Sequence, residues 1–217
     1  MNQPRMESGD AKIREDICIL AKSLFDRGYG CGSSGNISVL TDTGMIVSPT
    51  NSCMGRLDPA QLSMVTRDGA HISGDQPSKE AFLHLAMYRE RPEMTAVVHL
   101  HATHSVAVSC LADLDPADVL PPITAYYVMR IGRLPLVPYF PPGDMALANA
   151  VREKAKHHHA MLLANHGPVV AGKSLENAVY AAEELEETAR LFLMLRGQKT
   201  RFLTQDQVAD LAVRFPS

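Results

Sequence analysis

Residues 95–101 read Thr-Ala-Val-Val-His-Leu-His, a short apolar run that ends in two histidines two positions apart. A run of this length predicts a buried strand. The segment before it predicts a helix over 77–91, and a further helix is expected from about Thr103. The strand therefore lies between two helices in the sequence, an order that indicates an α/β protein.

The N-terminal third predicts one helix followed by two β-hairpins. Apolar residues recur at helical spacing over 11–27, with Asp10 available as a cap and Gly28 just past the end. The next stretch is rich in glycine and predicts an irregular loop. Strands are then expected over 37–40 and 45–47, and on both sides of the Asp68-Gly69 turn.

The second half of the chain predicts further alternation of strands and helices. In order, we expect one or two strands within 123–137, a turn at 141–143, a helix over 144–156, a buried strand over 161–164, and helices over 174–195 and 204–215. No internal repeat or change of composition marks a domain boundary. The pattern therefore predicts a single α/β domain with a mixed sheet.

Composition excludes several classes of protein. The chain has 217 residues, 46% hydrophobic and 21% charged, which is typical of a globular protein. Lys and Arg total 21 against 24 Asp and Glu, so the net charge of -3 favours neither nucleic acid nor an acidic membrane as a partner. The polar N-terminus lacks the apolar core of a signal peptide, and no run is long enough for a membrane span. Four cysteines without CxxC spacing favour a reducing compartment, so we expect a cytoplasmic protein.

Three histidines in two motifs predict a metal site. Within the predicted strand, His99 and His101 are two residues apart, so both can point from one face toward one ion. His166, in Asn165-His166-Gly167-Pro168, follows the predicted strand over 161–164 and is the candidate third ligand. Three imidazoles that leave one position open are typical of catalytic Zn²⁺. The alternative is that these are buried histidines satisfied by hydrogen bonds.

A carboxylate and several small polar residues belong to the same group of motifs. Glu80 is expected in the first turn of the helix over 77–91, where it either compensates the helix dipole or acts as a general acid/base. Segments 33–36, 48–52 and 78–79 offer hydroxyls, N–H groups and one ammonium to a phosphate, and a helix N-terminus at Ser78 suits an anion. The alternative is that these residues form turns and caps.

The remaining histidines are expected to have other roles. His104 either supports the metal ligands or caps a helix, whereas His71 and His84 are given no function. The run His157-His158-His159 is expected to be solvated at a helix C-terminus, where the dipole favours it.

Five motifs together resemble the class II aldolase family. They are Gly-Asn-Ile-Ser at 35–38, Ser-Pro-Thr at 48–50, Pro-Ser-Lys-Glu at 77–80, His-Leu-His at 99–101 and Asn-His-Gly at 165–167. Their order and spacing hold over roughly residues 12–196. The family includes fuculose-phosphate aldolase, ribulose-phosphate 4-epimerase and related decarboxylases.

The resemblance implies a fold and an assembly. It implies a single domain over 1–217, with 1–10 and 200–217 at the periphery, built on a mixed, largely antiparallel sheet flanked by helices. It also implies a C4 homotetramer with active sites near the subunit interfaces. One Zn²⁺ per subunit is expected, with Mn²⁺ or Co²⁺ as alternatives.

The resemblance also implies roles for individual residues. The metal ligands would be His99, His101, His166 and Glu80, and Glu80 would also be the catalytic acid/base. The residues that match phosphate-binding segments are Asn36, Thr50, Asn51, Ser78 and Lys79. Tyr126 matches a catalytic tyrosine that some members supply from the adjacent subunit.

Departures from the aldolase pattern point to one subgroup. Thr50 is followed by Asn51 where sugar-phosphate aldolases carry Gly, and Ser-Lys-Glu at 78–80 replaces Ser-Ser-Glu. These features resemble 3-oxo-tetronate 4-phosphate decarboxylases. They imply metal-dependent decarboxylation of a phosphorylated four-carbon sugar acid, through an enediolate, to dihydroxyacetone phosphate and CO₂. The alternatives are an aldolase or 4-epimerase acting on a ketose phosphate, and a non-catalytic domain like the adducin head.

Overall fold

A computed structural model describes residues 8–141 and 143–215 of the chain. The strands are β1 (Asn36–Leu40), β2 (Met45–Val47), β3 (Ser63–Val65), β4 (His71–Ser73), β5 (Ala96–His99), β6 (Leu136–Val137), β7 (Ala160–Leu163) and β8 (Gly167–Gly172). The helices are α1 (Ser8–Asp26), α2 (Ala81–Glu90), α3 (Thr103–Ser109), α4 (Ala125–Arg130), α5 (Met145–Ala155), α6 (Leu175–Leu195) and α7 (Gln205–Arg214), with a 3₁₀ turn, η1 (Met54–Arg56).

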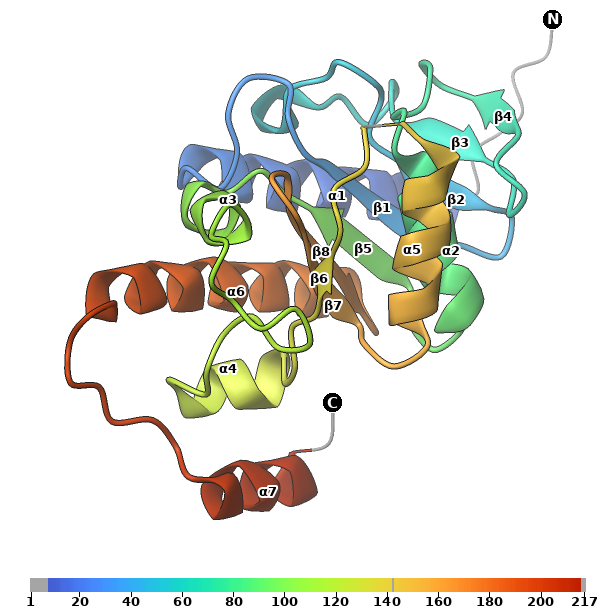
Figure 1. The fold of residues 1–217 in the computed structure, drawn as a ribbon. Helices are drawn as coiled ribbons and strands as arrows, with labels where there is room; N and C mark the ends of the chain where they lie inside the picture. Colours follow the sequence, from blue (N-terminus) through green and yellow to red (C-terminus); the bar gives the residue numbers. More distant parts are fainter. Residues whose placement is uncertain (1–7, 142, 216–217) are drawn as a thin grey trace, which may run out of the picture.

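Within these residues, the strands form one sheet in the order β4-β3-β2-β1-β5-β8-β7-β6 (Figure 1). Neighbouring strands are antiparallel except for β6 and β7, which are parallel. The predicted α/β fold with a mixed, largely antiparallel sheet is therefore confirmed. The run at 95–101 supplies the central strand β5, which pairs with β1 on one side and β8 on the other.

Helices cover both faces of the sheet and enclose two apolar cores (Figure 1). Side chains of α1 and α6 pack against one face, and side chains of α2 and α5 pack against the other. Alternate residues of β5 enter different cores: Ala96 and Val98 face α1 and α6, whereas Val97 faces α2. By the same alternation, His99 projects to the side of α2.

Most helix boundaries match their sequence signals. Ser174 and Asp144 cap α6 and α5 as expected, because their side chains accept hydrogen bonds from the N–H groups of Asn177 and Ala146. The first helix begins at Ser8, so Asp10 lies in its first turn and does not cap it. Of the turn predicted at 141–143, Pro142 lies outside the described residues.

The prediction of strands within 123–137 is wrong for residues 125–130, which form α4. Thr124 is the N-cap, and its side chain accepts a hydrogen bond from the Tyr127 N–H at 3.1 Å. This local cap and the burial of Tyr127 outweigh the β-branched and aromatic composition that suggested a strand. The remainder of that segment does contain a strand, the two-residue β6.

The first helix after the hairpins also differs from its prediction. Helix α2 begins at Ala81, and Glu80 is the N-cap residue with φ -102° and ψ 9°. Residues 77–80 form a turn before the helix, anchored by a bridge between Pro49 and Pro77. Ser78 therefore lies two residues before the N-cap and outside the helix itself, and its predicted role in binding an anion stays a prediction.

Among the helices within residues 8–141 and 143–215, none combines the length and apolar composition needed to cross a membrane.

Candidate metal centre

His99 ends β5 and has its imidazole fixed by the backbone of β8. Its Nδ1 donates to the Pro168 carbonyl at 2.8 Å, and the side chain is fully buried. A carbonyl oxygen only accepts hydrogen bonds, so Nδ1 carries the hydrogen of the neutral ring. The lone pair of Nε2 is therefore free to bind a metal ion. A metal-binding histidine commonly donates the N–H of its other ring nitrogen to an acceptor such as a backbone carbonyl.

His166 reaches the same point through an unusual turn between β7 and β8. Asn165 adopts φ 55°, and Gly167 adopts φ 155°. A Cβ on Gly167 would lie 2.2 Å from the Leu100 carbonyl oxygen, so the start of β8 approaches β5 this closely only because residue 167 is glycine. The Asn-His-Gly motif therefore carries the imidazole of His166 to the end of β5.

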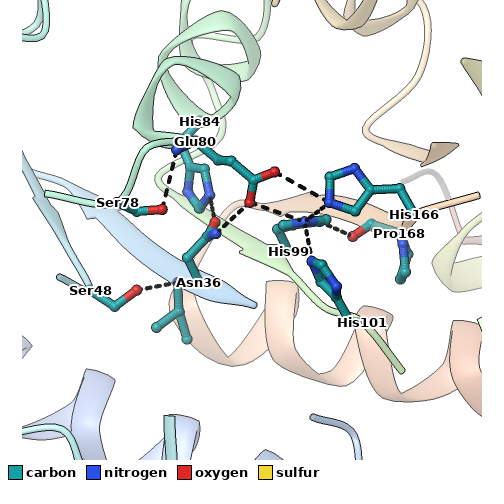
Figure 2. A network of polar contacts seen from close by, with 10 residues as sticks. Asn36, Ser48, Ser78, Glu80, His84, His99, His101, His166 and Pro168 are labelled. Atoms are coloured by element: carbon teal, nitrogen blue, oxygen red, sulfur yellow. Dashed lines mark hydrogen bonds and ion pairs between the residues drawn. The ribbon is translucent and has the colours of Figure 1, made fainter. Parts of the chain in front are cut away.

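The candidate ligand atoms converge as Figure 2 shows. His99 Nε2 lies 3.2 Å from His101 Nε2 and 3.3 Å from His166 Nε2. Glu80 closes the cluster, with Oε2 at 3.4 Å from His99 Nε2 and Oε1 at 3.3 Å from His166 Nε2. All four residues offer ligand atoms within 4.8 Å of one another. His101 lies just beyond the end of β5, so the prediction that both histidines belong to the strand holds only for His99.

These distances fit a tetrahedral ion. Ligands about 2.05 Å from a tetrahedral centre are about 3.3 Å apart, a separation that the close pairs match. Glu80 Oε1 is buried and has no hydrogen-bond donor within the described part of the chain. A buried carboxylate oxygen without a donor is costly unless a cation satisfies it, so the donor set suits a divalent metal.

Electrostatics place these groups in the protonation states that bind metals. Burial lowers the pKa of His101 to about 4, and burial likewise lowers the pKa of His99. Burial by itself raises the pKa of Glu80, but the facing His166 and His99 and the hydrogen bond from Asn36 outweigh burial and hold that pKa well below its usual range. The imidazoles of His99 and His101 are therefore neutral and the carboxylate of Glu80 is ionised at neutral pH.

Comparisons with known proteins agree with this arrangement. Residues 15–193 match the model of the class II aldolase and adducin N-terminal domain, which covers most of the chain. The chain belongs to the class II aldolase and adducin family. The chain is 50% identical over 203 residues to 3-oxo-tetronate 4-phosphate decarboxylase of Escherichia coli strain K12, a match that covers 93% of this chain and 96% of that protein.

A solved structure and a curated aldolase are also similar to this chain. The crystal structure of YgbL from Escherichia coli superposes with a TM-score of 0.92 at 49% identity, over 94% of this chain and 99% of that one. L-fuculose phosphate aldolase of Escherichia coli strain K12 is 34% identical over 180 residues, or 82% of this chain and 80% of that protein. The fold and the family resemblance inferred from the five motifs are therefore confirmed.

The residues that match the family's phosphate-binding segments have different surroundings. Thr50 and Asn51 line a cavity of about 400 Å³ together with Arg56, and Asn51 adopts φ 55°. Lys79 is exposed, and Ser78 is half-buried with its hydroxyl accepting from the Glu80 N–H at 3.3 Å. Asn36 is buried, and its amide nitrogen donates to Glu80 Oε2 at 3.0 Å.

Tyr126 lies on α4, with 61% of its surface exposed. It lines a surface hollow of about 510 Å³ with Tyr180 and Arg130, whereas His101 and His166 line a separate cavity. Within one chain, these two cavities share no lining residue. The role that the class II aldolase family implies for Tyr126 therefore stays a prediction.

Sequence reasoning missed two residues beside the centre. His84, which was given no function, is completely buried, and its Nε2 is hydrogen-bonded to Asn36 Oδ1. Its position four residues after Glu80, on the same helix face, was the available signal. Tyr139 is 60% exposed and lines the cavity of about 530 Å³ at His101 and His166. The only signal for Tyr139 was an exposed aromatic in a proline-flanked loop.

Two other histidines also find definite partners. His104 donates its backbone N–H to Glu186 Oε1, and its Nδ1 lies 2.8 Å from the same oxygen. Glu186 therefore caps α3, and His104 belongs to this cap. His159 donates to the Arg130 carbonyl at 2.9 Å, so the expectation of a solvated run at 157–159 is wrong for this residue.

Proposed function

We propose that the chain is a metal-dependent carboxy-lyase that converts 3-oxo-tetronate 4-phosphate to dihydroxyacetone phosphate and CO₂. The observation that carries the proposal is 50% identity to a decarboxylase of this substrate over 93% of the chain. The convergence of Glu80 with three histidines supports the chemistry, because it supplies a metal-binding donor set beside a buried carboxylate.

The substrate is a β-keto acid, and its chemistry defines what the site must do. Loss of CO₂ leaves an electron pair on C2, which delocalises onto the C3 oxygen as an enediolate. A divalent metal ion, which we propose to be Zn²⁺ held by His99, His101, His166 and Glu80, supplies Lewis-acid stabilisation of that charge. The reaction ends when C2 receives a proton in place of the lost carboxyl group.

Glu80 is the proposed source of that proton. The carboxylate is ionised in the free protein, so it must gain a proton before it can act as an acid. An anionic substrate bound beside it raises its pKa, because a second negative charge nearby disfavours ionisation. We therefore propose that Glu80 takes up a proton on substrate binding and delivers it to C2.

Further residues complete the proposal. The residues proposed to bind the substrate phosphate are Asn36, Thr50, Asn51, Ser78 and Lys79. Tyr126 is proposed to act in the active site of an adjacent subunit of a homotetramer. We also propose that 1–217 is one cytoplasmic domain with 1–10 and 200–217 at its periphery.

A coupled assay tests the function. Zinc-loaded protein is given freshly generated 3-oxo-tetronate 4-phosphate, and dihydroxyacetone phosphate is followed through NADH consumption. Chelator-sensitive turnover well above the spontaneous rate is expected. Turnover of a ketose phosphate without CO₂ release would instead identify an aldolase or epimerase, the alternative favoured by the 34% identical L-fuculose phosphate aldolase. Absence of stoichiometric metal would indicate a non-catalytic domain of the adducin type.

A further inference from the structure

A series of buried polar side chains leads from the interior of the protein to the Glu80 carboxylate, and its last members are drawn in Figure 2. His84 is completely buried and uses both ring nitrogens: Nδ1 lies 2.6 Å from Ser38 Oγ, and Nε2 is hydrogen-bonded to Asn36 Oδ1. Asn36 Nδ2 then donates to Glu80 Oε2 at 3.0 Å. We call Ser38, His84 and Asn36 the relay.

The chemistry of the groups fixes the direction of every hydrogen bond in the relay. A carboxylate only accepts, so Asn36 presents its N–H groups to Glu80 and its Oδ1 to His84. Oδ1 also only accepts, so His84 Nε2 must carry a hydrogen. Burial lowers the pKa of His84 to about 3, so the ring is neutral and Nδ1 is left to accept from the Ser38 hydroxyl.

The relay is clamped between two elements. Asn36 and Ser38 alternate on β1, and His84 lies on α2, which packs on that face of the sheet. At the far end, Ser38 Oγ lies 2.7 Å from the hydroxyl of Tyr88, one turn after His84 on α2. The Tyr88 hydroxyl also lies 3.2 Å from the Ser38 carbonyl oxygen. Tyr88 therefore contacts both the hydroxyl and the backbone of Ser38, the residue that begins the relay.

We propose that His84 is a positioning residue that holds the Asn36 amide with its N–H, and not its carbonyl, toward Glu80. The two ends of an amide have nearly the same shape, so packing alone does not choose between them. A carbonyl turned toward Glu80 would repel the carboxylate and displace it from His99 and His166. The direction of the hydrogen bonds does not depend on the proposed function, whereas the effect on turnover rests on it.

Two substitutions separate the hydrogen bond from the packing. His84→Phe keeps a ring in the core but removes the donor, and His84→Gln keeps a donor near the position of Nε2. We expect His84→Phe to lower kcat and metal affinity by roughly tenfold or more, the usual effect of losing a partner that orients a ligand. KM should change little, and His84→Gln should recover most of both losses. Met87→Leu, in the core on the same helix, is the control and should match the wild-type protein.

A double-mutant cycle tests whether His84 acts through Asn36. If it does, His84→Phe combined with Asn36→Leu should be no worse than Asn36→Leu alone, in both metal affinity and kcat. A residue that only maintained the core would give additive losses, and that result would overturn the proposal. Metal affinity, measured by titration, remains informative if the protein fails to turn over the proposed substrate.

Nitrogen-15 NMR of the histidine rings tests the direction directly in the full-length metal-free protein. The resonances of His84 are assigned by their loss in His84→Gln. We expect the Nε2–H tautomer, unchanged from pH 8 to pH 5. An Nδ1–H tautomer would reverse the relay and overturn the proposal, whatever the activity measurements show.

Discussion

Asn36 and His99 are paired directly across the antiparallel ladder between β1 and β5. Residues opposite each other on neighbouring strands project from the same face of the sheet, so both side chains point toward α2. Glu80 stands at the start of that helix and contacts both of them. The position of the candidate metal centre therefore follows from the register of two strands and the point where one helix begins.

Replacing Glu80 with Gln separates its proposed roles. The amide keeps the size of the side chain but cannot deliver a proton to C2, so turnover should fall by at least about a hundredfold. Three imidazoles remain, so metal content in the purified protein should stay near one per chain. Both quantities are measured on the same sample, by the coupled assay and by elemental analysis. Turnover near that of the wild-type protein would exclude Glu80 as the acid.

Gly167→Ala tests the close approach of β8 to β5. The new Cβ would meet the Leu100 carbonyl oxygen, and φ 155° is unfavourable for alanine. Displacement of His166 should weaken metal binding, and the free energy of unfolding should fall by about 1–3 kcal/mol. Gly9→Ala is the matched control, because Gly9 lies in α1 with no atom within 4 Å of a new Cβ. That change should be neutral or stabilising by up to about 1 kcal/mol, as urea titrations of both variants can show.

The sequence predicted the fold well where the signals were local. Ser174 and Asp144 cap helices in the structure because a side-chain oxygen near free N–H groups needs no distant partner. Strand β8 escaped prediction because Pro168 and flanking glycines discourage a strand, and only its position between β5 and β7 stabilises it. Tertiary packing also explains why residues 125–130 form the helix α4, although the composition around Tyr127 favours a strand.

The candidate site was predictable only in part for the same reason. The spacing of two between His99 and His101 is recognisable, and His166 follows a predicted strand. The convergence of the three histidines could therefore be expected. The burial of His84 could not, because it depends on how α2 lies over β1. A histidine in a helical segment of the sequence has no local feature that distinguishes a solvated ring from one bonded to Ser38 and Asn36.

Stability of the metal-free protein should fall as the pH is lowered from 6.5. His84 has its pKa lowered to about 3, so below pH 6.5 the unfolded chain binds a proton that the folded protein does not. This group therefore leaves the free energy of unfolding unchanged above pH 6.5 and lowers it progressively from pH 6.5 toward pH 3. At pH 5, this one group lowers the free energy of unfolding by about 2 kcal/mol relative to its value at neutral pH. In urea titrations at pH 7.5 and pH 5, His84→Gln should lose about that much less than the wild-type protein, and parallel losses would contradict the assignment.

Metal binding should raise the thermal stability of the protein. A ligand that binds only the folded state contributes about 2.7 kcal/mol at a hundredfold excess over its Kd, which corresponds to roughly 5–10 °C in Tm for a domain of this size. Adding Zn²⁺ to chelator-treated protein should produce this shift, and chelation should reverse it. His166→Ala should abolish the response. An equal shift in that variant would place the responsible ion elsewhere.

Mixed oligomers test the proposed contribution of Tyr126 to a neighbouring subunit. Glu80→Gln and Tyr126→Phe chains should each be nearly inactive alone, because every site lacks one proposed catalytic group. In a co-expressed homotetramer whose sites combine Glu80 of one subunit with Tyr126 of the next, random assembly restores roughly a quarter of the sites. The coupled assay on co-purified, differently tagged chains should therefore recover about a quarter of the wild-type rate. If both groups acted within one chain, every site in the mixture would carry one defect, and co-expression would restore nothing.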